Sequence, residues 1–539
     1  MAGLATAFGS GAMTNSVEDL VEARAIFVIG SNTTIAHPII GYQIKKAVRE
    51  RGAKLIVADP RRIPLVDLAA HWLALKPGTN VALLNGIMNV ILAEGLADRD
   101  FIAARTEGFA ALEEVLPAYP PERVEQITGV PAEEIRAAAR LYAGSGPAAI
   151  CYTMGITQHT SGTDNVLSLA NLAMLTGNIG KRGAGVNPLR GQNNVQGACD
   201  MGGLPNYYTA YQKVADPAAR AKFEHAWGVA LPAEPGRTLG EIVDGALAGA
   251  VKALYVMGEN PLVSDPDTAH VKHAFAKLDF LVVQDIFLTE TARLADVVFP
   301  AASFAEKEGT FTNTERRVQR VRAATVPPGE AKGDWEIIAA VSGAMGHPLI
   351  YGSAAEIMAE IQTLTPSYAS ISYDRLEACG LHWPCPTPEH PGTPILHTKE
   401  FTRGKGLFSR VEYRPAAEEP DADYPLRLTT GRSLWQYHTG TMTRRAPGLE
   451  ALAPRSWLEI NPEDAAVLGI ADGDAVAVTS RRGTVATTAL VTTGINPGVV
   501  FMPFHYAESS ANVLTNSAVD PIAKIPELKV CAVRVAAQS

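Results

Sequence analysis

The sequence has 539 residues, of which 47% are hydrophobic and 19% charged, and its 47 Lys and Arg against 56 Asp and Glu leave a formal net charge of −9. This composition is typical of a globular chain, excludes general disorder, and disfavours broad binding to nucleic acid or to anionic membranes. No apolar run reaches the roughly 18 residues of a membrane span, and the first residues lack a signal-peptide pattern, so we expect a cytoplasmic chain without membrane contact.

The first predicted elements form a βαβ unit. Residues 25–30 are a short apolar run that ends in glycine, and residues 31–37 are a predicted loop. Pro38 opens a helix whose apolar residues recur at helical spacing, and Gly52 is placed to end it. A second strand over residues 54–58 completes the unit.

Similar apolar runs return at residues 149–154, 253–257, 280–284 and 295–299. Near-continuous apolar runs of this length are typical of parallel strands that helices cover on both faces. We therefore predict an α/β fold with two doubly wound, mostly parallel sheet domains, over residues 1–145 and 146–383.

A proline-rich segment and a β-rich region follow. Five prolines fall between residues 384 and 394, and no helix or central strand tolerates that density, so residues 384–423 are predicted to be a connector. Beyond it, short alternating runs such as 475–478 and 484–491 are separated by turns that contain glycine. This pattern predicts a β-barrel domain over residues 424–539.

The cysteines and two weak motifs set limits on metal and ATP chemistry. The five cysteines form no Cys-x-x-Cys pair, so we expect a reducing compartment and no iron–sulfur cluster built locally from this chain. Residues 177–185 resemble a phosphate loop, but Leu175 and Arg182 break the Walker pattern. His270 and His273 lack a third ligand nearby and favour a solvated helix face. We predict neither ATP binding nor a metal held by these side chains.

Polar loops follow the first two strands, at the sheet edge where doubly wound proteins bind ligands. Residues 30–34 offer backbone N–H groups, hydroxyls and a helix N-terminus to a phosphate, while Asp59 and Arg61 are suited to a sugar or purine edge and a phosphate. This pattern fits nucleotide binding and ordinary helix capping equally well. A plain NAD-type site is disfavoured, because the first turn lacks G-x-G-x-x-G.

The densest polar segment runs from Asn187 to Gly203 and is rich in amides and glycines around Arg190. One interpretation is a glycine-rich turn with solvated amides. The favoured interpretation is a loop that wraps a polar ligand, in which Arg190 is a fixed cation able to bind a small carboxylate through two hydrogen bonds.

Three segments, 154–158, 175–180 and 187–203, make a family resemblance recognisable. They resemble the catalytic (alpha) subunit of molybdenum or tungsten formate dehydrogenases, which are bis-molybdopterin guanine dinucleotide oxidoreductases. The likeness runs from residues 2–15 to residues 530–533. Within that superfamily the segment R-G-Q-N-N-V-Q-G-A-C-D-M-G, which begins at Arg190, is highly specific for formate dehydrogenases.

The resemblance implies a molybdopterin oxidoreductase fold and a bis-molybdopterin guanine dinucleotide cofactor with molybdenum or tungsten. The positions that match the family's cofactor loops in the α/β domains are Asn32, Asp59, Arg61, Gly78, Thr79, Met154, Gln158, Gln192, Gly258, Glu259, Gln284, Asp285 and Asp334. In the barrel they are Thr430, Gly431, Arg432, His438, Asn512 and Lys529. Arg190 matches the arginine that orients formate, so the implied reaction is oxidation of formate to CO2 with transfer of two electrons to the metal.

The resemblance also implies parts that this sequence does not contain. In the family, a segment upstream of the present Met1 holds a four-cysteine motif for a 4Fe-4S cluster, a lysine, the cysteine or selenocysteine that ligates the metal, and a histidine. We therefore expect the missing segment, or a complementary polypeptide, to be a partner, together with iron–sulfur or flavin electron-transfer subunits. The chain alone is expected to be inactive.

One hypothesis explains this start. Met1 stands where the family has a valine, and GTG is both a valine codon and an alternative start codon. An upstream selenocysteine codon, UGA, would be taken as a stop in gene annotation, which makes the sequence a fragment of a longer selenoprotein. Natural fission and a cysteine enzyme with a sequencing error are the alternatives.

Two other functions were weighed against formate oxidation. The first is a relative with another substrate, such as nitrate, which the R-G-Q-N-N segment disfavours. The second is a non-catalytic scaffold similar to the large iron–sulfur subunit of respiratory complex I, which the matching cofactor loops disfavour.

Overall fold

The structure is a computed structural model that describes residues 1–538, and these residues divide into two compact units. Unit 1 comprises residues 1–189, 263–269 and the chain from Ile395 onward. Unit 2 comprises residues 190–262 and 270–394. Within residues 1–538, no helix is both long enough and apolar enough to cross a lipid bilayer.

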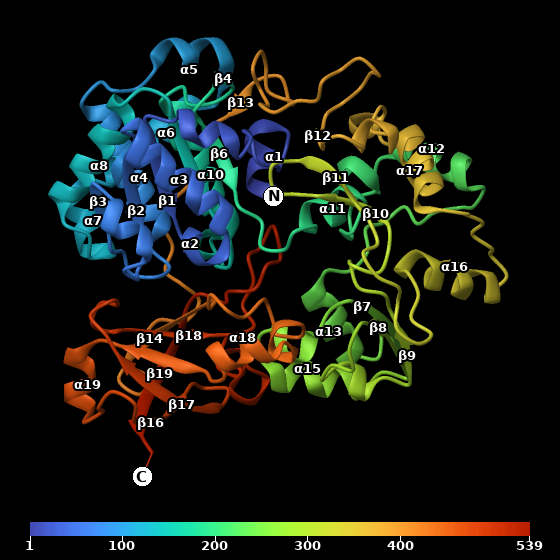
Figure 1. The fold of residues 1–539 in the computed structure, drawn as a ribbon. Helices are drawn as coiled ribbons and strands as arrows, with labels where there is room; N and C mark the ends of the chain where they lie inside the picture. Colours follow the sequence, from blue (N-terminus) through green and yellow to red (C-terminus); the bar gives the residue numbers. More distant parts are fainter. Residues whose placement is uncertain (539) are drawn as a thin grey trace. The chain divides into compact units, whose positions relative to one another are not determined.

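The first part of unit 1 is built on a five-stranded parallel sheet with the order β3-β2-β1-β5-β6 (Figure 1). The strands are β1 (Ala25–Ile29), β2 (Lys54–Ala58), β3 (His71–Leu73), β5 (Ala148–Tyr152) and β6 (Gly185–Pro188). Ala25 lies opposite both Lys54 and Ala148, so β1 pairs with β2 on one side and with β5 on the other. This is the doubly wound topology that the sequence predicts.

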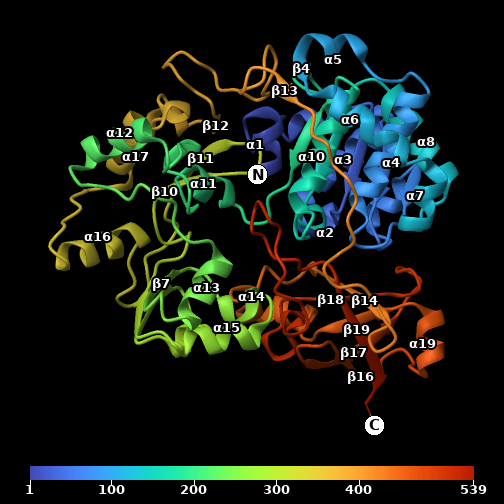
Figure 2. The same cartoon turned by 180° about the vertical axis from the view of Figure 1, so that it is seen from behind.

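Helices cover both faces of this sheet. They are α1 (Ala2–Phe8), α2 (Thr33–Ala36), α3 (Pro38–Arg51), α4 (Asn80–Ala93), α5 (Arg99–Arg105), α6 (Phe109–Val115), α7 (Pro121–Thr128), α8 (Ala132–Gly144), α9 (Met154–Thr157) and α10 (Gly162–Leu175). Side chains alternate along β1, so Phe27 packs with α4, α8 and α10 while Ile26 packs with α3. Figure 2 shows α4, α7 and α8 close together, and side chains of all three belong to one core cluster. Helix α3 begins at the predicted Pro38 and is capped by Gly52 at φ 72°, a backbone conformation that favours glycine.

The expected boundary at residue 145 does not coincide with the division of the structure. Strands β5 and β6 belong to the first sheet, and the division falls after Leu189. The reason is the parallel pairing of β1 with β5, which links residues far apart in the sequence and which apolar patterning cannot reveal.

A closed six-stranded β-barrel forms the last part of unit 1, as predicted, with the order β14-β18-β15-β17-β16-β19. Its strands are β14 (Leu426–Gly431), β15 (Trp457–Ile460), β16 (Ala475–Thr479), β17 (Thr484–Val491), β18 (Val499–Pro503) and β19 (Cys531–Ala537), and its helices are α18 (Pro447–Leu452) and α19 (Pro462–Leu468). Strand β19 pairs with both β14 and β16 and so closes the barrel. Closure removes the exposed strand edges of an open sheet.

The expected connector, residues 384–423, is only partly a linker. Its second half belongs to unit 1, where Phe401, Phe408 and Val411 are buried in the core of the first sheet. A short strand, β13 (Gly406–Leu407), pairs in parallel with β4 (Thr106–Glu107). Burial of these apolar side chains anchors the segment, although its prolines exclude longer regular elements.

Unit 2 contains a parallel sheet of β7 (Ala253–Met257), β8 (Phe280–Asp285) and β9 (Val297–Pro300), and an antiparallel sheet of β10 (Gly309–Thr312), β11 (Arg317–Val321) and β12 (Leu381–His382). Its helices are α11 (Val195–Asp200), α12 (Pro217–Trp227), α13 (Leu239–Leu247), α16 (Asp334–Ala344) and α17 (Ala354–Leu364); α14 (Pro261–Ser264) and α15 (Thr268–Phe275) cross the division between the units.

The sequence predicts that helices cover both faces of the parallel sheet of unit 2, and the structure differs from this prediction. Side chains of α13 and α15 pack on the face that carries Leu281 and Val283. On the other face Tyr255, Met257 and Phe280 are 40%, 51% and 45% exposed. Val282 and Gln284, which lie on that same face, are buried, so this face is only partly covered.

Candidate functional site

Two loops meet at the carboxyl edge of the first sheet. Gly30 has φ 57°, and a Cβ atom there would lie 2.7 Å from the carbonyl carbon of Gly155. Gly155 N and Thr153 Oγ1 both donate to the Gly30 carbonyl, at 3.2 and 2.6 Å. No residue larger than glycine fits at this crossing without a backbone shift, so the loops after β1 and β5 form one continuous edge.

Two polar side-chain atoms at the start of α2, just after β1, lack partners within residues 1–538. Asn32 Oδ1 and Thr34 Oγ1 are buried and make no hydrogen bond. Buried polar atoms are nearly always hydrogen-bonded in native proteins. These two atoms therefore indicate a ligand-binding loop more than a helix cap, which the sequence alone left open.

Asp59 and Arg61 follow β2 and lie together. Arg61 N donates to Asp59 Oδ1 at 3.0 Å. The Arg61 guanidinium donates to both oxygens of Glu459, at 2.9 and 2.6 Å, and lies 3.6 Å from the centre of the Phe501 ring. The sequence expectation had no place for Glu459, which belongs to β15 of the barrel. Arg61 thus joins the α/β part of unit 1 to the barrel, and its charge is already paired.

A buried group of cations lies on the barrel side. Lys529 Nζ donates to the Thr430 carbonyl at 2.7 Å. Burial lowers the pKa of Lys529 to about 7, with a further contribution from Arg432, and Asp59 opposes this shift. Burial also raises the pKa of Asp59 to about 6. Burial, with a further contribution from Arg432, lowers the pKa of His438 to about 4. Cations whose charged form is so disfavoured form a site suited to an anion.

The remaining expected residues of unit 1 are more dispersed. Buried Gly78 lies beside Val530, which follows Lys529. Thr79 directly precedes α4, and its Oγ1 donates to the Lys76 carbonyl at 2.7 Å. Met154 begins α9 and Gln158 follows its end. In the barrel, a Cβ atom on Gly431 would lie 2.6 Å from the Phe501 ring, and Asn512 Nδ2 donates to the carbonyls of Val263 and Ser264, both at 2.9 Å.

In unit 2, expected residues gather at the carboxyl ends of β7 and β8. Gln284 is buried, and its Nε2 donates to Asp334 Oδ1 at 2.8 Å. Gly258 N donates to the Gln284 carbonyl at 2.8 Å. Asp285 Oδ1 accepts from Phe287 N at 3.2 Å, whereas Glu259 is exposed. Asp334 also pairs with Lys307, which the sequence expectation did not include.

Arg190 lies in unit 2, directly after β6. Its backbone N–H donates to Thr314 Oγ1 at 3.0 Å, its Nε donates to Gln196 Oε1 at 3.1 Å, and its Nη1 is 3.9 Å from Cys199 Sγ. Gln192, also expected at the site, accepts from Val195 N through its carbonyl at 3.4 Å. Gln196 was not singled out from the sequence.

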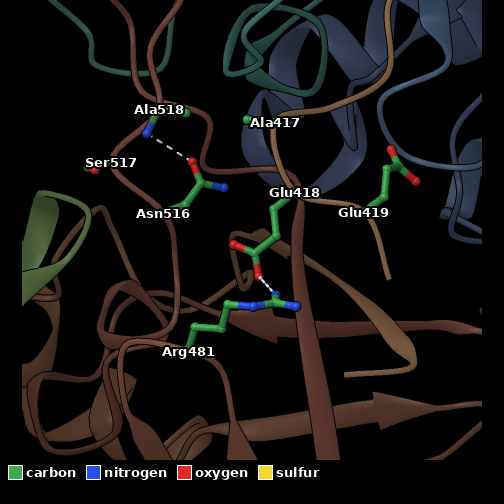
Figure 3. A pocket seen from close by; sticks show the side chains of 7 residues that line it. All are labelled: Ala417, Glu418, Glu419, Arg481, Asn516, Ser517 and Ala518. Atoms are coloured by element: carbon green, nitrogen blue, oxygen red, sulfur yellow. Dashed lines mark hydrogen bonds and ion pairs between the residues drawn. The ribbon is translucent and has the colours of Figure 1, made fainter. Parts of the chain in front are cut away.

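A separate pocket of about 580 Å³ in unit 1 contains none of the expected residues (Figure 3). It is lined by Ala417, Glu418, Glu419, Arg481, Asn516, Ser517 and Ala518. Glu418 accepts from Arg481 and Arg482 at 2.8 and 2.6 Å, and Asn516 accepts from Ala518 N at 2.9 Å. Because these polar groups satisfy one another, the pocket does not compete with the loops above as the candidate site.

Two known protein families match the sequence of this chain. Residues 3–344 match the family described as Molybdopterin oxidoreductase, and residues 426–532 match the Molydopterin dinucleotide binding domain. The chain therefore belongs to the molybdopterin oxidoreductase family, and its cofactor is a molybdenum or tungsten pterin.

Individual relatives show to which group of molybdopterin oxidoreductases the chain is most similar. The chain is 53% identical to the F420-dependent formate dehydrogenase subunit alpha of Methanocaldococcus jannaschii, over 99% of this chain and 79% of that protein. It is 43% identical to formate dehydrogenase H of Escherichia coli, over 99% of this chain and 76% of that protein. Within its family the chain thus belongs with the formate dehydrogenase alpha subunits.

A solved structure supports the fold. Acetylene hydratase from Pelobacter acetylenicus is similar at a TM-score of 0.78 and 21% identity, over 99% of this chain and 80% of that one. At this identity the likeness shows the fold alone.

The residues present fit a pterin dinucleotide. Phosphates are anions, and Lys529 and Arg432 are basic side chains whose pKa values burial lowers. The unpaired Asn32 Oδ1 and Thr34 Oγ1 suit a polar ligand, and the Gly30–Gly155 crossing exposes backbone rather than side chains.

Proposed function

We propose that this chain is the catalytic subunit that oxidises formate to CO2 and a proton and passes two electrons to a molybdenum or tungsten ion held by two pterin guanine dinucleotides. One observation carries the proposal: Arg190, in the formate-dehydrogenase-like segment, is held by a buried glutamine. The 53% identity to a formate dehydrogenase alpha subunit supports it.

In the proposed reaction, Arg190 binds the carboxylate of formate. The guanidinium is permanently charged, and its planar fork matches two carboxylate oxygens. Gln196 accepts from Nε and so fixes the plane of the fork. This ion pair neutralises the substrate and points its C–H bond in one direction, which contributes orientation and electrostatic stabilisation to catalysis. When bound, the cofactor supplies the two-electron acceptor.

We assign the two dinucleotides to two sets of loops. The first set is Asn32, Asp59, Arg61, Gly78 and Thr79, where the cations Lys529 and Arg432 are suited to phosphate. The second set, for the pterin and the second dinucleotide, comprises Met154, Gln158, Gln192, Gly258, Glu259, Gln284, Asp285 and Asp334. We assign Thr430, Gly431, Arg432, His438, Asn512 and Lys529 to the face of the barrel that covers the cofactor. Several of these residues lie at or just after the carboxyl ends of strands, where doubly wound sheets bind their ligands.

The finer parts of the proposal concern what lies outside this sequence. The relatives are longer than the part that the chain covers. We place the 4Fe-4S cluster and a cysteine or selenocysteine metal ligand in an upstream segment, and we expect iron–sulfur or flavin electron-transfer subunits as partners in the cytoplasm. An in-frame UGA followed by a histidine codon upstream of codon 1 supports the selenoprotein hypothesis, and an unrelated gene there contradicts it.

Two measurements test the function. The chain, purified from a host that makes the cofactor, is denatured and the released nucleotide is identified; we expect guanine nucleotide, whereas its absence contradicts cofactor binding. The full-length enzyme, with its upstream segment, is then assayed with a redox dye. We expect dye reduction by formate, and nitrate-dependent dye oxidation without formate activity would instead identify a nitrate reductase.

A further inference from the structure

In unit 2, a buried carboxylate is linked to Arg190 through one intervening side chain. Asp200 ends α11 and is 1% exposed. It accepts four hydrogen bonds: Oδ1 from Gln196 Nε2 and Tyr211 OH, both at 2.7 Å, and Oδ2 from Tyr368 OH at 2.6 Å and Trp383 Nε1 at 2.7 Å. Burial raises the pKa of Asp200, and these hydrogen bonds oppose the rise. A buried carboxylate with both oxygens satisfied is a rigid acceptor.

Gln196 lies between this carboxylate and the arginine. A carboxylate only accepts hydrogen bonds and a guanidinium only donates them. The Gln196 amide must therefore turn its Nε2 toward Asp200 and its Oε1 toward Arg190, and the distances of 2.7 and 3.1 Å agree. The side-chain amide satisfies both neighbours at once, because it has a donor on one side and an acceptor on the other.

The surroundings hold this arrangement against strain. Tyr211 and Ala210 have φ of 62° and 53°, a left-handed conformation that is unfavourable for both residues. The Tyr211 hydroxyl nevertheless donates to Asp200 and also accepts from Gln196 Nε2 at 2.9 Å. Strain of this kind persists where neighbouring contacts fix a position and is common at functional sites.

We propose that Asp200 is a positioning residue for Arg190: it fixes the orientation of the Gln196 amide, which in turn fixes the plane of the guanidinium that receives the substrate carboxylate. The linkage among the three side chains stands on geometry alone. Its effect on formate rests on the function proposed above.

The first test needs neither cofactor nor turnover. The chain is labelled with ¹⁵N-arginine, the Nε–H signal of Arg190 is assigned by its loss in Arg190→Lys, and its hydrogen exchange is measured. We expect Asp200→Asn to accelerate exchange about tenfold or more, because an asparagine lets the Gln196 amide turn and the Nε–H lose its acceptor. Gln196→Met removes the acceptor itself and should give the same acceleration.

A matched control separates positioning from loss of stability. Asp520 is also 1% exposed and fully hydrogen-bonded, but it lies in unit 1, where it accepts from Thr163 N and Oγ1, both at 2.8 Å. Asp520→Asn should leave the Arg190 signal unchanged. If Asp200→Asn does not fold, Tyr211→Phe removes one donor from Asp200 and should accelerate exchange about two- to fivefold. Unchanged Arg190 exchange in folded Asp200→Asn or Tyr211→Phe overturns the proposal.

The second test is a double-mutant cycle in the full-length enzyme. Asp200→Asn and Gln196→Met should each lower kcat/KM for formate about 10- to 100-fold, and the double variant should be no worse than Gln196→Met alone. Additive losses contradict action through Gln196. Lack of formate turnover in the wild-type enzyme would remove the proposed function and leave the exchange result, and so the linkage, standing.

Discussion

The two units bury polar groups in opposite ways. Around Asp200 in unit 2, one carboxylate is surrounded by neutral donors, and both of its oxygens are satisfied by side chains of the chain itself. Around Lys529 in unit 1, cations lie close together, and the pKa values of Lys529 and Asp59 are both shifted toward their neutral forms. The first arrangement is complete without a ligand and suits positioning. The second becomes favourable when an anion is added, as expected of a site that holds a phosphate.

The largest effect is expected from a change at Arg190, the side chain that Asp200 is proposed to position. Arg190→Lys keeps the charge and removes the planar fork, so kcat/KM for formate in the full-length enzyme should fall by about two to three orders of magnitude. Guanine nucleotide content should stay normal. Arg182, whose side chain is 76% exposed, provides the control, because Arg182→Lys should have no effect. Normal formate kinetics in Arg190→Lys would remove Arg190 from the active site.

The Lys529 side is tested through its ligand. Lys529→Met replaces the buried ammonium group with an uncharged side chain of similar length. The purified chain should then retain about tenfold less guanine nucleotide, because a charge-assisted hydrogen bond to the phosphate is lost. Activity per bound nucleotide should change far less than activity per chain. Full nucleotide content in this variant is the outcome that contradicts a phosphate at Lys529.

In the chain without cofactor, the free energy of unfolding should depend on pH because of Lys529. The unfolded pKa of lysine is about 10.4, and that of Lys529 in the folded chain is about 7. The unfolded chain then binds the extra proton, so stability should rise by about 1 kcal/mol between about pH 7 and about pH 8. Urea unfolding of wild type and Lys529→Met measures this, and the variant should lack the rise.

Asp59 gives the opposite sign at lower pH. Its folded pKa of about 6 exceeds the unfolded value of about 3.9. The folded chain binds the extra proton between these values, so its contribution to stability should fall as the pH rises through about 4 to about 6. The same titrations on Asp59→Asn should remove that fall, and an identical curve in variant and wild type contradicts the shift.

The smallest effect is expected at Arg61, because Glu459 already pairs with its charge. Glu459→Gln should destabilise the chain by about 1 kcal/mol, because the glutamine keeps one acceptor for the guanidinium. Nucleotide content should stay the same or increase, since the cluster becomes more positive. The exposed pair of Arg62 and Asp67 serves as control, and Asp67→Asn should change neither quantity.

Local sequence patterns predicted the elements of the fold well. Strands β2, β7 and β17 have the predicted bounds, and α3 begins and ends at its proline and glycine signals. Apolar runs and helix caps are short-range, so they are visible in the sequence. The structure divides after Leu189 and not at residue 145, because the division depends on which strands pair, and the pairing of β1 with β5 is a long-range contact.

The same distinction applies to the site. Polar loops after strands identified Asp59, Arg61 and Arg190 as candidates, and the roles of those residues stay predictions. Gln196 and Asp200 were missed, although their spacing of four residues on a short helix was a usable signal. Glu459, Tyr368 and Trp383 gave no such signal, since each reaches its partner from a distant part of the chain.

The closure of the barrel also sets an order of events during synthesis. Strand β19 must pair with β14 and β16 before the barrel is complete, and Lys529 lies just ahead of it. A nascent chain that has emerged through α19 already carries Asp59, Arg61 and Glu459 but not the lysine. We expect loading with the pterin to follow translation of this strand. Ribosome-bound chains stalled before Lys529 should retain no guanine nucleotide, and retention by such chains would contradict that timing.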